Sequence, residues 1–215
     1  MEVPRGVADL QRCDVTLGSI LVTRREAAHL RWLVRRPRRR VGAERGRAMG
    51  LPQGTVTFVF TDLEGSTRRW EAHPAEMRLA LARHDAIVRG AVEAHGGVVF
   101  AAMGDGLAAV FASAREAVRA VLAAQQGLAA EDWGEVTGPL AARIGLLTDE
   151  GVLGGEQYLN QPLNRCARLM AAGHGGQVLV SGATALLVGD DLPSGCGLVD
   201  LGEHRLRDLA RPVRS

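Results

Sequence analysis

The sequence predicts an α+β fold in which helices pack on one face of a mainly antiparallel sheet. Short apolar runs rich in β-branched residues alternate with amphipathic helical stretches along most of the chain. Two of these runs, residues 98–103 and 107–111, flank a Gly-Asp-Gly turn, which is typical of a tight antiparallel hairpin. The central order of strands and helices is β-α-β-β-α-β, which is the order of the ferredoxin-like (split βαβ) arrangement.

The first strand is predicted over residues 55–60. These residues are β-branched or aromatic and carry no charge, as in a strand that is buried on both faces. A short helix is expected from residue 68, and the His73-Pro74 pair should end it, because the residue before a proline is disfavoured in the α region. A long helix follows over 75–95, where apolar residues recur at helical spacing.

The elements after the hairpin are mostly shorter. Pro162 stands in the first turn of a helix that ends before Gly173, as a proline and a glycine should. The polar, glycine-rich residues 149–161 are expected to form a loop or an irregular hairpin arm. The other predicted elements are a helix (114–130), a loop (131–139), a strand (140–148), a strand (177–180), a helix (181–188) and a segment that leads into a last strand (197–202).

Residues 1–50 differ in composition from the rest of the chain. They contain 12 arginines and 5 acidic residues, a net charge of +7, in a chain whose formal net charge is +2. The arginine-rich run at 35–40 has no apolar periodicity, and such runs usually stay solvated. We therefore expect a disordered leader, or sequence that is not a true domain, before one domain at 51–215. A nucleic-acid-binding arm is the alternative that we do not favour.

The cysteines and the hydropathy indicate the environment of the protein. Cys13, Cys166 and Cys196 are widely spaced and form no CxxC pair, which argues for a reducing compartment and against a disulfide framework. No apolar run reaches the roughly 18 residues that span a bilayer, and the N-terminus lacks the pattern of a secretory signal. These features are typical of a soluble cytoplasmic protein.

Two carboxylates are predicted to converge at one edge of the sheet. Asp62 follows the first strand and precedes a helix, and Asp105 lies in the hairpin turn. In a ferredoxin-like sheet the first strand lies beside the hairpin strands, so the two side chains should come close. Mg²⁺ prefers one or two carboxylates, and water and phosphate oxygens complete its shell. The alternative is that Asp62 and Ser66 only cap the helix and that Asp105 is only a turn residue.

Four short segments of the chain share a distinctive order and spacing. Residues 54–67 read GTVTFVFTDLEGST, residues 100–106 read FAAMGDG, residues 163–168 read LNRCAR, and residues 201–209 read LGEHRLRDL. In this order they resemble the first metal motif, the second metal hairpin, the asparagine-xxx-arginine helix and the closing segment of the class III adenylate and guanylate cyclases. The resemblance covers residues 54–212 and implies the cyclase version of the ferredoxin-like fold.

The resemblance also implies a two-metal site beside a nucleotide site. Asp62 and Asp105, with the backbone carbonyl of Leu63, would bind two divalent ions, either Mg²⁺ or Mn²⁺. The phosphates would be held by the backbone N–H groups of Gly65, Ser66 and Thr67, and by Arg207.

Asn164 and Arg168 would act on the ribose and on the α-phosphoryl group. Asn164 would orient the ribose, and Arg168 would stabilise the charge that develops during attack by the 3′-oxygen. The two residues are four apart and so share one helix face. Sites of this family form across a head-to-tail homodimer, so this pair would face the metals of the other subunit. The implied reaction converts a nucleoside triphosphate, with ATP favoured over GTP and GTP left open, into a 3′,5′-cyclic nucleotide and pyrophosphate for signal transduction.

The base-selecting positions depart from the family pattern. The usual adenine-selecting lysine of the metal hairpin is Ala101 here, and its acidic or threonine partner is Gln157, which can still donate and accept hydrogen bonds. Residues 147–149, Leu-Thr-Asp, replace the more usual His-Thr-Gly. The alternative function is therefore a catalytically weak domain that binds nucleotide or dimerises as a regulatory module. The chain also stops near the place where the last core strand of the family would continue, which suggests a truncated C-terminus.

Overall fold

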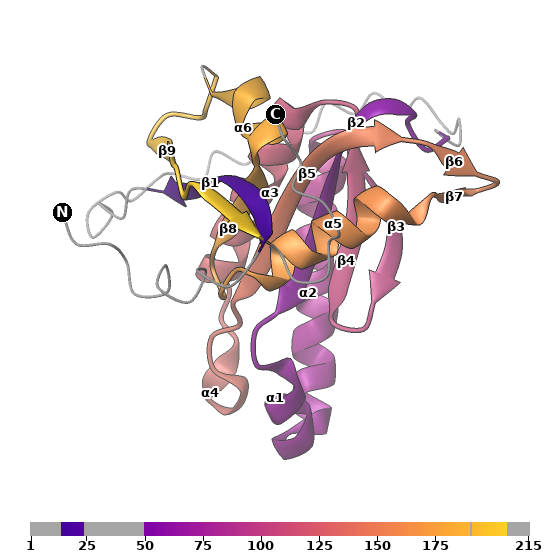
Figure 1. Ribbon diagram of the computed structural model, residues 1–215. Coiled ribbons are helices and arrows are strands. Elements are labelled where there is room, and N and C mark those ends of the chain that lie inside the picture. The colour runs from indigo at the N-terminus through magenta and orange to yellow at the C-terminus, as the bar shows by residue number, and fades with distance from the viewer. Residues whose placement is uncertain (1–13, 24–49, 190, 206–215) are drawn as a thin grey trace, which may run out of the picture.

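The computed structural model describes residues 14–23, 50–189 and 191–205. An eight-stranded sheet runs through the molecule and has helices packed against it (Figure 1). The main path of this sheet has the strand order β10-β1-β8-β5-β2-β4-β3, and β9 pairs with β1. The predicted α+β class is confirmed.

Four strands form the ferredoxin-like part of the sheet. β2 (Gly54–Leu63) lies between β5 (Ala142–Gly151) and β4 (Gly106–Phe111), and β3 (Val98–Met103) pairs with β4. All three of these pairs are antiparallel. β3 and β4 form the predicted hairpin, and the spatial order β5-β2-β4-β3 is the one that the split βαβ arrangement requires. This order places the end of β2 beside the hairpin turn.

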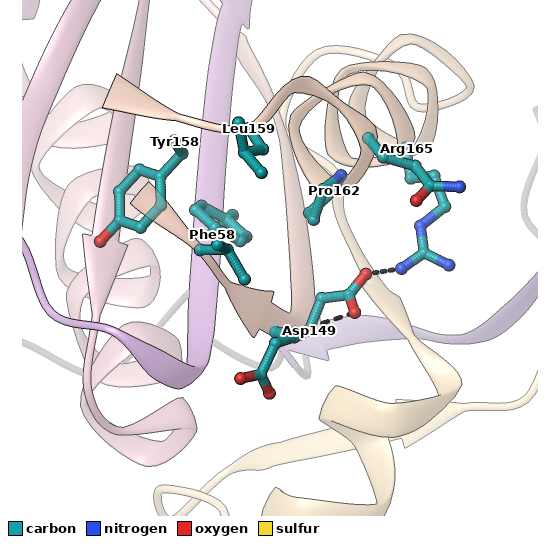
Figure 2. A pocket seen from close by; sticks show the side chains of 9 residues that line it. Phe58, Asp149, Tyr158, Leu159, Pro162 and Arg165 are labelled. Atoms are coloured by element: carbon teal, nitrogen blue, oxygen red, sulfur yellow. Dashed lines mark hydrogen bonds and ion pairs between the residues drawn. The ribbon is translucent and has the colours of Figure 1, made fainter. Parts of the chain in front are cut away.

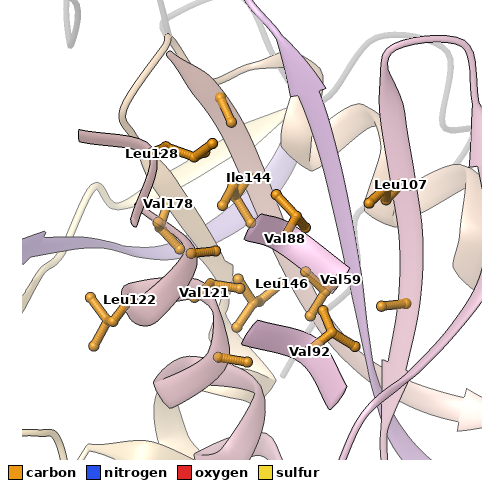
Figure 3. Close-up of a cluster of buried hydrophobic side chains, with 14 of the residues drawn as sticks. Val59, Val88, Val92, Leu107, Val121, Leu122, Leu128, Ile144, Leu146 and Val178 are labelled. Carbon is orange, nitrogen blue, oxygen red and sulfur yellow. The ribbon is translucent and has the colours of Figure 1, made fainter. Parts of the chain in front are cut away.

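The two long helices cover one face of the sheet. α2 (Pro74–Ala94) and α3 (Ala114–Ala130) contribute Val88, Val92 and Val121 to a buried cluster. Successive side chains of a strand point to opposite faces, so Val59 of β2 reaches this cluster while its neighbours do not. Figure 3 shows these side chains between the helices and the sheet, together with Leu146 of β5.

The alternate residues of β2 face the other way. Phe58 and Phe60 form a second buried cluster with Tyr158 and with Cys166 and Leu169 of α5 (Asn160–Ala171). The sequence predicted this helix but placed all helices on one face of the sheet. Because β2 is apolar on both sides, its second face also needs cover, and α5 provides part of it.

The remaining elements connect these layers. The break predicted at His73 is present, since α1 (Ser66–Ala72) ends before this residue and α2 begins after it. The segment predicted as a loop or hairpin arm contains the end of β5, a two-stranded arm and the first residues of α5. Further described elements are α4 (Gly134–Thr137), β6 (Leu153–Gly154), β7 (Gln157–Tyr158), β8 (Val178–Ser181), α6 (Gly182–Val188), β9 (Cys196–Val199) and β10 (Glu203–Arg205).

Part of the expected leader is a strand. β1 (Asp14–Thr23) pairs antiparallel with β8, β9 and β10. Its partners come from the last part of the chain, and a local sequence pattern does not reveal partners so distant. The rest of the expected leader, residues 1–13 and 24–49, lies outside the described residues, and the domain boundary at residue 51 stays a prediction. Within the described ranges, no helix is both long enough and apolar enough to cross a membrane.

Candidate active site

The turn of the β3–β4 hairpin is held against the end of β2. A Cβ added to Gly106 would lie 2.1 Å from the carbonyl oxygen of Thr61 and 3.5 Å from the Cα of Asp62. The backbone N–H of Leu107 also donates to the Thr61 hydroxyl over 3.0 Å. Asp105, the residue before Gly106, is therefore brought next to Asp62, as the topology predicted.

The environment of Asp105 fits a cation ligand. Its Oδ2 atom is buried and has no hydrogen-bond partner. A buried carboxylate oxygen without a partner is costly unless a cation or a donor reaches it. The described residues contain no cluster of three or more His, Cys, Asp or Glu side chains arranged to hold a metal. Two carboxylates are nevertheless enough to bind Mg²⁺ when water and substrate phosphates complete its coordination shell.

Asp62 already has a cationic neighbour on the adjacent strand. Asp62 and Arg143 are directly opposed in the β2–β5 pair. Arg143 donates from Nε to Oδ2 of Asp62 over 2.7 Å, and its Nη2 atom forms an ion pair with the same oxygen at 2.5 Å. Both side chains are partly accessible, with 22% of Asp62 and 31% of Arg143 exposed. The sequence analysis did not single out Arg143, because only the strand register shows that it opposes Asp62.

The loop after Asp62 leads into α1 without a side-chain cap. Gly65 is the N-cap residue and has a φ of 67°, in the left-handed region that favours glycine. Arg69 donates to the carbonyl oxygen of Glu64 over 2.8 Å, which holds the loop against the helix. Neither Asp62 nor Ser66 caps α1, so the simple capping alternative is wrong. The backbone N–H groups at Ser66 and Thr67 stand at the start of this short helix.

Asn164 and Arg168 lie on α5, on the second face of the sheet. The helix is anchored by Cys166, whose thiol donates to the carbonyl oxygens of Phe58 and Gly145 over 3.6 and 3.5 Å. Burial raises the pKa of this thiol. Asn164 is exposed and Arg168 is half-buried, and neither side chain belongs to the buried clusters. One copy of the chain thus presents the ribose-side candidate at its surface.

Ala101 and Gln157 border an aromatic cluster on the same face as α5. The ring centroids of Phe100 and Tyr158 are 5.4 Å apart, and those of Phe58 and Tyr158 are 5.0 Å apart. Ala101 packs against this cluster, and Gln157 is exposed beside it on β7. The two base-selecting candidates are therefore the chain neighbours of two rings in contact. Arg207, the remaining phosphate candidate, lies outside the described residues.

A pocket of about 200 Å³ opens beside Tyr158 (Figure 2). Asp149 and Arg165 form an ion pair at its edge, and Leu159 and Pro162 line it. Burial lowers the pKa of the Arg165 guanidinium. The sequence analysis noted Asp149 only as a departure from the family pattern and did not connect it with Arg165. The ion pair ties the start of α5 to β5 close to Asn164.

The fold defines a nucleotidyl cyclase type of domain, since solved cyclase domains share it. An adenylate/guanylate cyclase/hydrolase from Silicibacter pomeroyi is 25% identical with a TM-score of 0.62, over 74% of this chain and 93% of that chain. The guanylyl cyclase Cya2 is 28% identical with a TM-score of 0.56, over 66% of this chain and 82% of that chain. No protein-family model matches the sequence. The chain carries a class III nucleotidyl cyclase domain.

A curated relative extends the likeness. An uncharacterized protein of Mycobacterium tuberculosis is 42% identical over 162 residues, which are 75% of this chain and 54% of that protein. The chain therefore spans about half the length of the curated relatives that it matches.

Proposed function

We propose that this chain is a nucleotidyl cyclase that converts a nucleoside triphosphate, ATP in preference to GTP, into a 3′,5′-cyclic nucleotide and pyrophosphate. The observation that carries the proposal is the approach of the hairpin turn to the end of β2, which brings Asp105, with its unpartnered buried oxygen, next to Asp62. The cyclase fold supports the same reaction. We place the activity in cytoplasmic signal transduction, in line with the widely spaced cysteines.

Three oxygen donors of this chain would hold the divalent ions. These are the carboxylates of Asp62 and Asp105 and the backbone carbonyl of Leu63, which all lie where β2 meets the hairpin turn. When bound, two such ions polarise the phosphoryl oxygens and neutralise charge on the attacking and leaving oxygens. Both Mg²⁺ and Mn²⁺ suit a site made only of oxygen donors.

The other residues would orient the substrate around the bond change. The 3′-oxygen of the ribose forms a bond to the α-phosphorus while the bond from that phosphorus to pyrophosphate breaks. The leaving pyrophosphate takes the electron pair, and the 3′-hydroxyl proton passes to solvent. Asn164 would hold the ribose, and the Arg168 guanidinium would balance the negative charge on the α-phosphoryl oxygens. The N–H groups at Gly65, Ser66 and Thr67, and Arg207, would contact the β- and γ-phosphates.

Two copies of the chain would complete each site. The metal carboxylates stand at the end of β2, whereas Asn164 is exposed on α5, which is anchored at Phe58, four residues earlier in the strand. A head-to-tail homodimer would bring the α5 pair of one copy to the carboxylates of its partner and would make two equivalent sites.

The base site would be less selective than one that carries a lysine and an acidic residue. Ala101 offers no polar side chain, so Gln157 is left as the polar side chain at these two positions. An amide can both donate and accept hydrogen bonds and so can satisfy more than one base. We expect measurable turnover of both ATP and GTP, with ATP the better substrate.

A regulatory domain that binds nucleotide without turning it over is the second candidate. It is favoured by Ala101 and by the ion pair between Asp62 and Arg143, which engages one of the metal-site carboxylates. Such a domain would gain thermal stability from nucleotide and Mn²⁺ and would release no product.

One assay separates these two candidates. The full chain is incubated with ATP or GTP and Mn²⁺, and cyclic nucleotide is measured beside the nucleotide-dependent shift in melting temperature. The proposal predicts product from the wild-type chain and none from Asp62→Asn. Wild-type product formation rules out the regulatory reading. An Asp62→Asn protein that forms product at the wild-type rate would overturn the assignment of Asp62.

A further inference from the structure

A guanidinium holds one of the two carboxylates that we assign to the metals. Arg143 places both Nε and Nη2 on a single oxygen of Asp62, Oδ2, at 2.7 and 2.5 Å. Neither of these two contacts involves Oδ1 of Asp62. The arrangement is built by the sheet, because the two residues are directly opposed in the antiparallel pair of β2 and β5.

The second carboxylate, Asp105, has an oxygen without a hydrogen-bonding partner. Oδ2 of Asp105 is buried and has no hydrogen-bond partner. The described structure thus pairs one carboxylate of the site with a cation and leaves a buried oxygen of the other without a donor. The two carboxylates and the guanidinium together leave one negative charge in excess, which is less than the two that the carboxylates alone would offer to an incoming cation.

We propose that Arg143 is a positioning residue that competes with the divalent ion for Oδ2 of Asp62 and thereby sets the metal affinity of the site. In the metal-free protein Arg143 neutralises Asp62 by occupying Oδ2. Metal binding at Oδ2 moves the guanidinium away from that oxygen. The inference rests on the metal role given to Asp62 under the proposed function.

The physical argument is that guanidinium and metal are both cations and that one oxygen cannot satisfy both at close range. A divalent ion and a unit positive charge about 6 Å apart in a water-like medium repel enough to weaken binding about tenfold, and more where water is excluded. The placing of Asp62 does not depend on Arg143 alone. Its neighbours Thr61 and Leu63 are buried, and β2 is paired with β5 through Leu63 and with β4 through Phe60. Removing the charge should therefore release Oδ2 without displacing the carboxylate.

The test is the binding of Mn²⁺ alone to the full chain, measured from the electron paramagnetic resonance signal of free Mn²⁺ without nucleotide. Arg143→Gln should bind Mn²⁺ about tenfold more tightly than the wild type, since the repelling charge is gone. Arg143→Lys keeps the unit positive charge that repels the metal and should stay within about twofold of the wild type. Arg115→Gln is the matched control, because it breaks a remote surface ion pair, with Asp191, and should leave Mn²⁺ binding unchanged.

Two further variants test whether the gain in Mn²⁺ affinity depends on Asp62 and on the charge of Arg143. Asp62→Asn in the Arg143→Gln background should abolish the gain, because Asp62 supplies the contested oxygen. Arg143→Met, which keeps an apolar stem and removes the charge, should show the same gain as Arg143→Gln. Unchanged or weaker Mn²⁺ binding in a folded, charge-free variant would overturn the proposal. A gain that survives the loss of the Asp62 carboxylate would overturn it as well.

The Mn²⁺ titration does not require catalytic turnover. Its result therefore tests the role of Arg143 separately from the proposed cyclase activity. A wild-type chain that forms no cyclic nucleotide would contradict the cyclase reading and leave the Mn²⁺ result standing. A chain that forms cyclic nucleotide but shows no gain in Mn²⁺ affinity with Arg143→Gln would keep its function and lose this inference.

Discussion

Gly106 lies so close to Thr61 that no side chain fits between them. A Cβ at position 106 would stand 2.1 Å from the Thr61 carbonyl oxygen. The Thr61 hydroxyl accepts a hydrogen bond from the backbone N–H of Leu107. This bond holds β2 and β4 together at the hairpin turn. The close approach sets the distance between the hairpin turn and the end of β2, and with it the relation of Asp105 to Asp62.

Gly106→Ala should therefore damage both stability and the candidate site. The added methyl group meets backbone atoms, which cannot move aside as a flexible side chain could. We expect a loss of about 1–3 kcal/mol in the free energy of unfolding, together with a clear loss of Mn²⁺ affinity. Urea denaturation and a Mn²⁺ titration measure the two effects.

Gly90→Ala is the control for this prediction. Gly90 lies inside α2 with nothing within 4 Å of an added Cβ, so alanine should stabilise the helix by about 0.5–1 kcal/mol. If Gly106→Ala were as stable and as active as Gly90→Ala, the close approach would not be what places Asp105.

Asp105→Asn should separate stability from activity. The amide keeps the volume of the side chain but removes a buried oxygen charge that has no partner. We expect the melting temperature of the metal-free protein to stay equal or rise, while metal-dependent turnover falls by at least about 100-fold.

Asp62→Asn should give the contrasting result. It removes the partner of the Arg143 guanidinium, so the metal-free protein should lose up to about 1 kcal/mol of stability as well as its activity. Calorimetry without metal shows the difference between the two variants. A lower melting temperature for Asp105→Asn than for Asp62→Asn would contradict this account of the two carboxylates.

Much of the fold is readable from the sequence because its signals are local. The uncharged β-branched run before Asp62 predicts β2, and the Gly-Asp-Gly turn predicts the β3–β4 hairpin. The pairing of β1 depends on β8, β9 and β10, which lie near the other end of the described chain. No pattern within residues 14–23 specifies those partners.

The candidate site likewise has a part that the sequence predicts and a part that it does not. The topology alone predicts that Asp62 and Asp105 meet, since it places their strands side by side. The contact of Asp62 with Arg143 depends on the register of β2 and β5, and a shift of one residue would turn the arginine to the other face. The pair of Asp149 and Arg165 joins a strand to a helix and depends on how α5 packs. Charge patterns in a sequence do not carry such information.

Tyr158 should make the stability of the protein depend on pH in the alkaline range. Burial raises the pKa of this tyrosine above its ordinary value of 10.0, and its hydroxyl donates to the carbonyl oxygen of Pro52. The folded state therefore favours the neutral phenol. This contribution to stability is fully present below pH 10 and is lost as the pH rises through the raised pKa.

Because the chain has a single tyrosine, the ultraviolet absorbance of tyrosinate reports Tyr158 alone. We expect the transition at higher pH in the native protein than in urea. Tyr158→Phe should be less stable by about 1 kcal/mol at neutral pH, through the lost hydrogen bond, and this deficit should shrink above pH 10. Identical absorbance titrations in native and unfolded protein would refute the prediction.

Mixing two inactive variants tests whether the site is shared between copies. Arg168→Ala should lower turnover on the order of 10²–10³-fold, as the loss of a preorganised charge-stabilising donor does elsewhere. Asp62→Asn should be inactive through loss of the metal ligand. If the α5 pair of one copy serves the carboxylates of another, a mixed dimer contains one site with both defects and one intact site.

Equal mixing of the two variants should then restore about a quarter of the wild-type rate, since half of the dimers are mixed and each mixed dimer has one working site. Arg115→Ala mixed with Asp62→Asn is the matched control for the dilution of intact carboxylates, because Arg115 lies in a surface ion pair away from the site. That mixture should retain about half of the wild-type rate, in proportion to the intact carboxylates. Exchange of subunits is measured separately, by energy transfer between differently labelled copies in the same mixtures. If the Arg168→Ala mixture stays inactive although energy transfer shows that its subunits have exchanged, each copy builds its site alone and the proposed homodimeric arrangement fails.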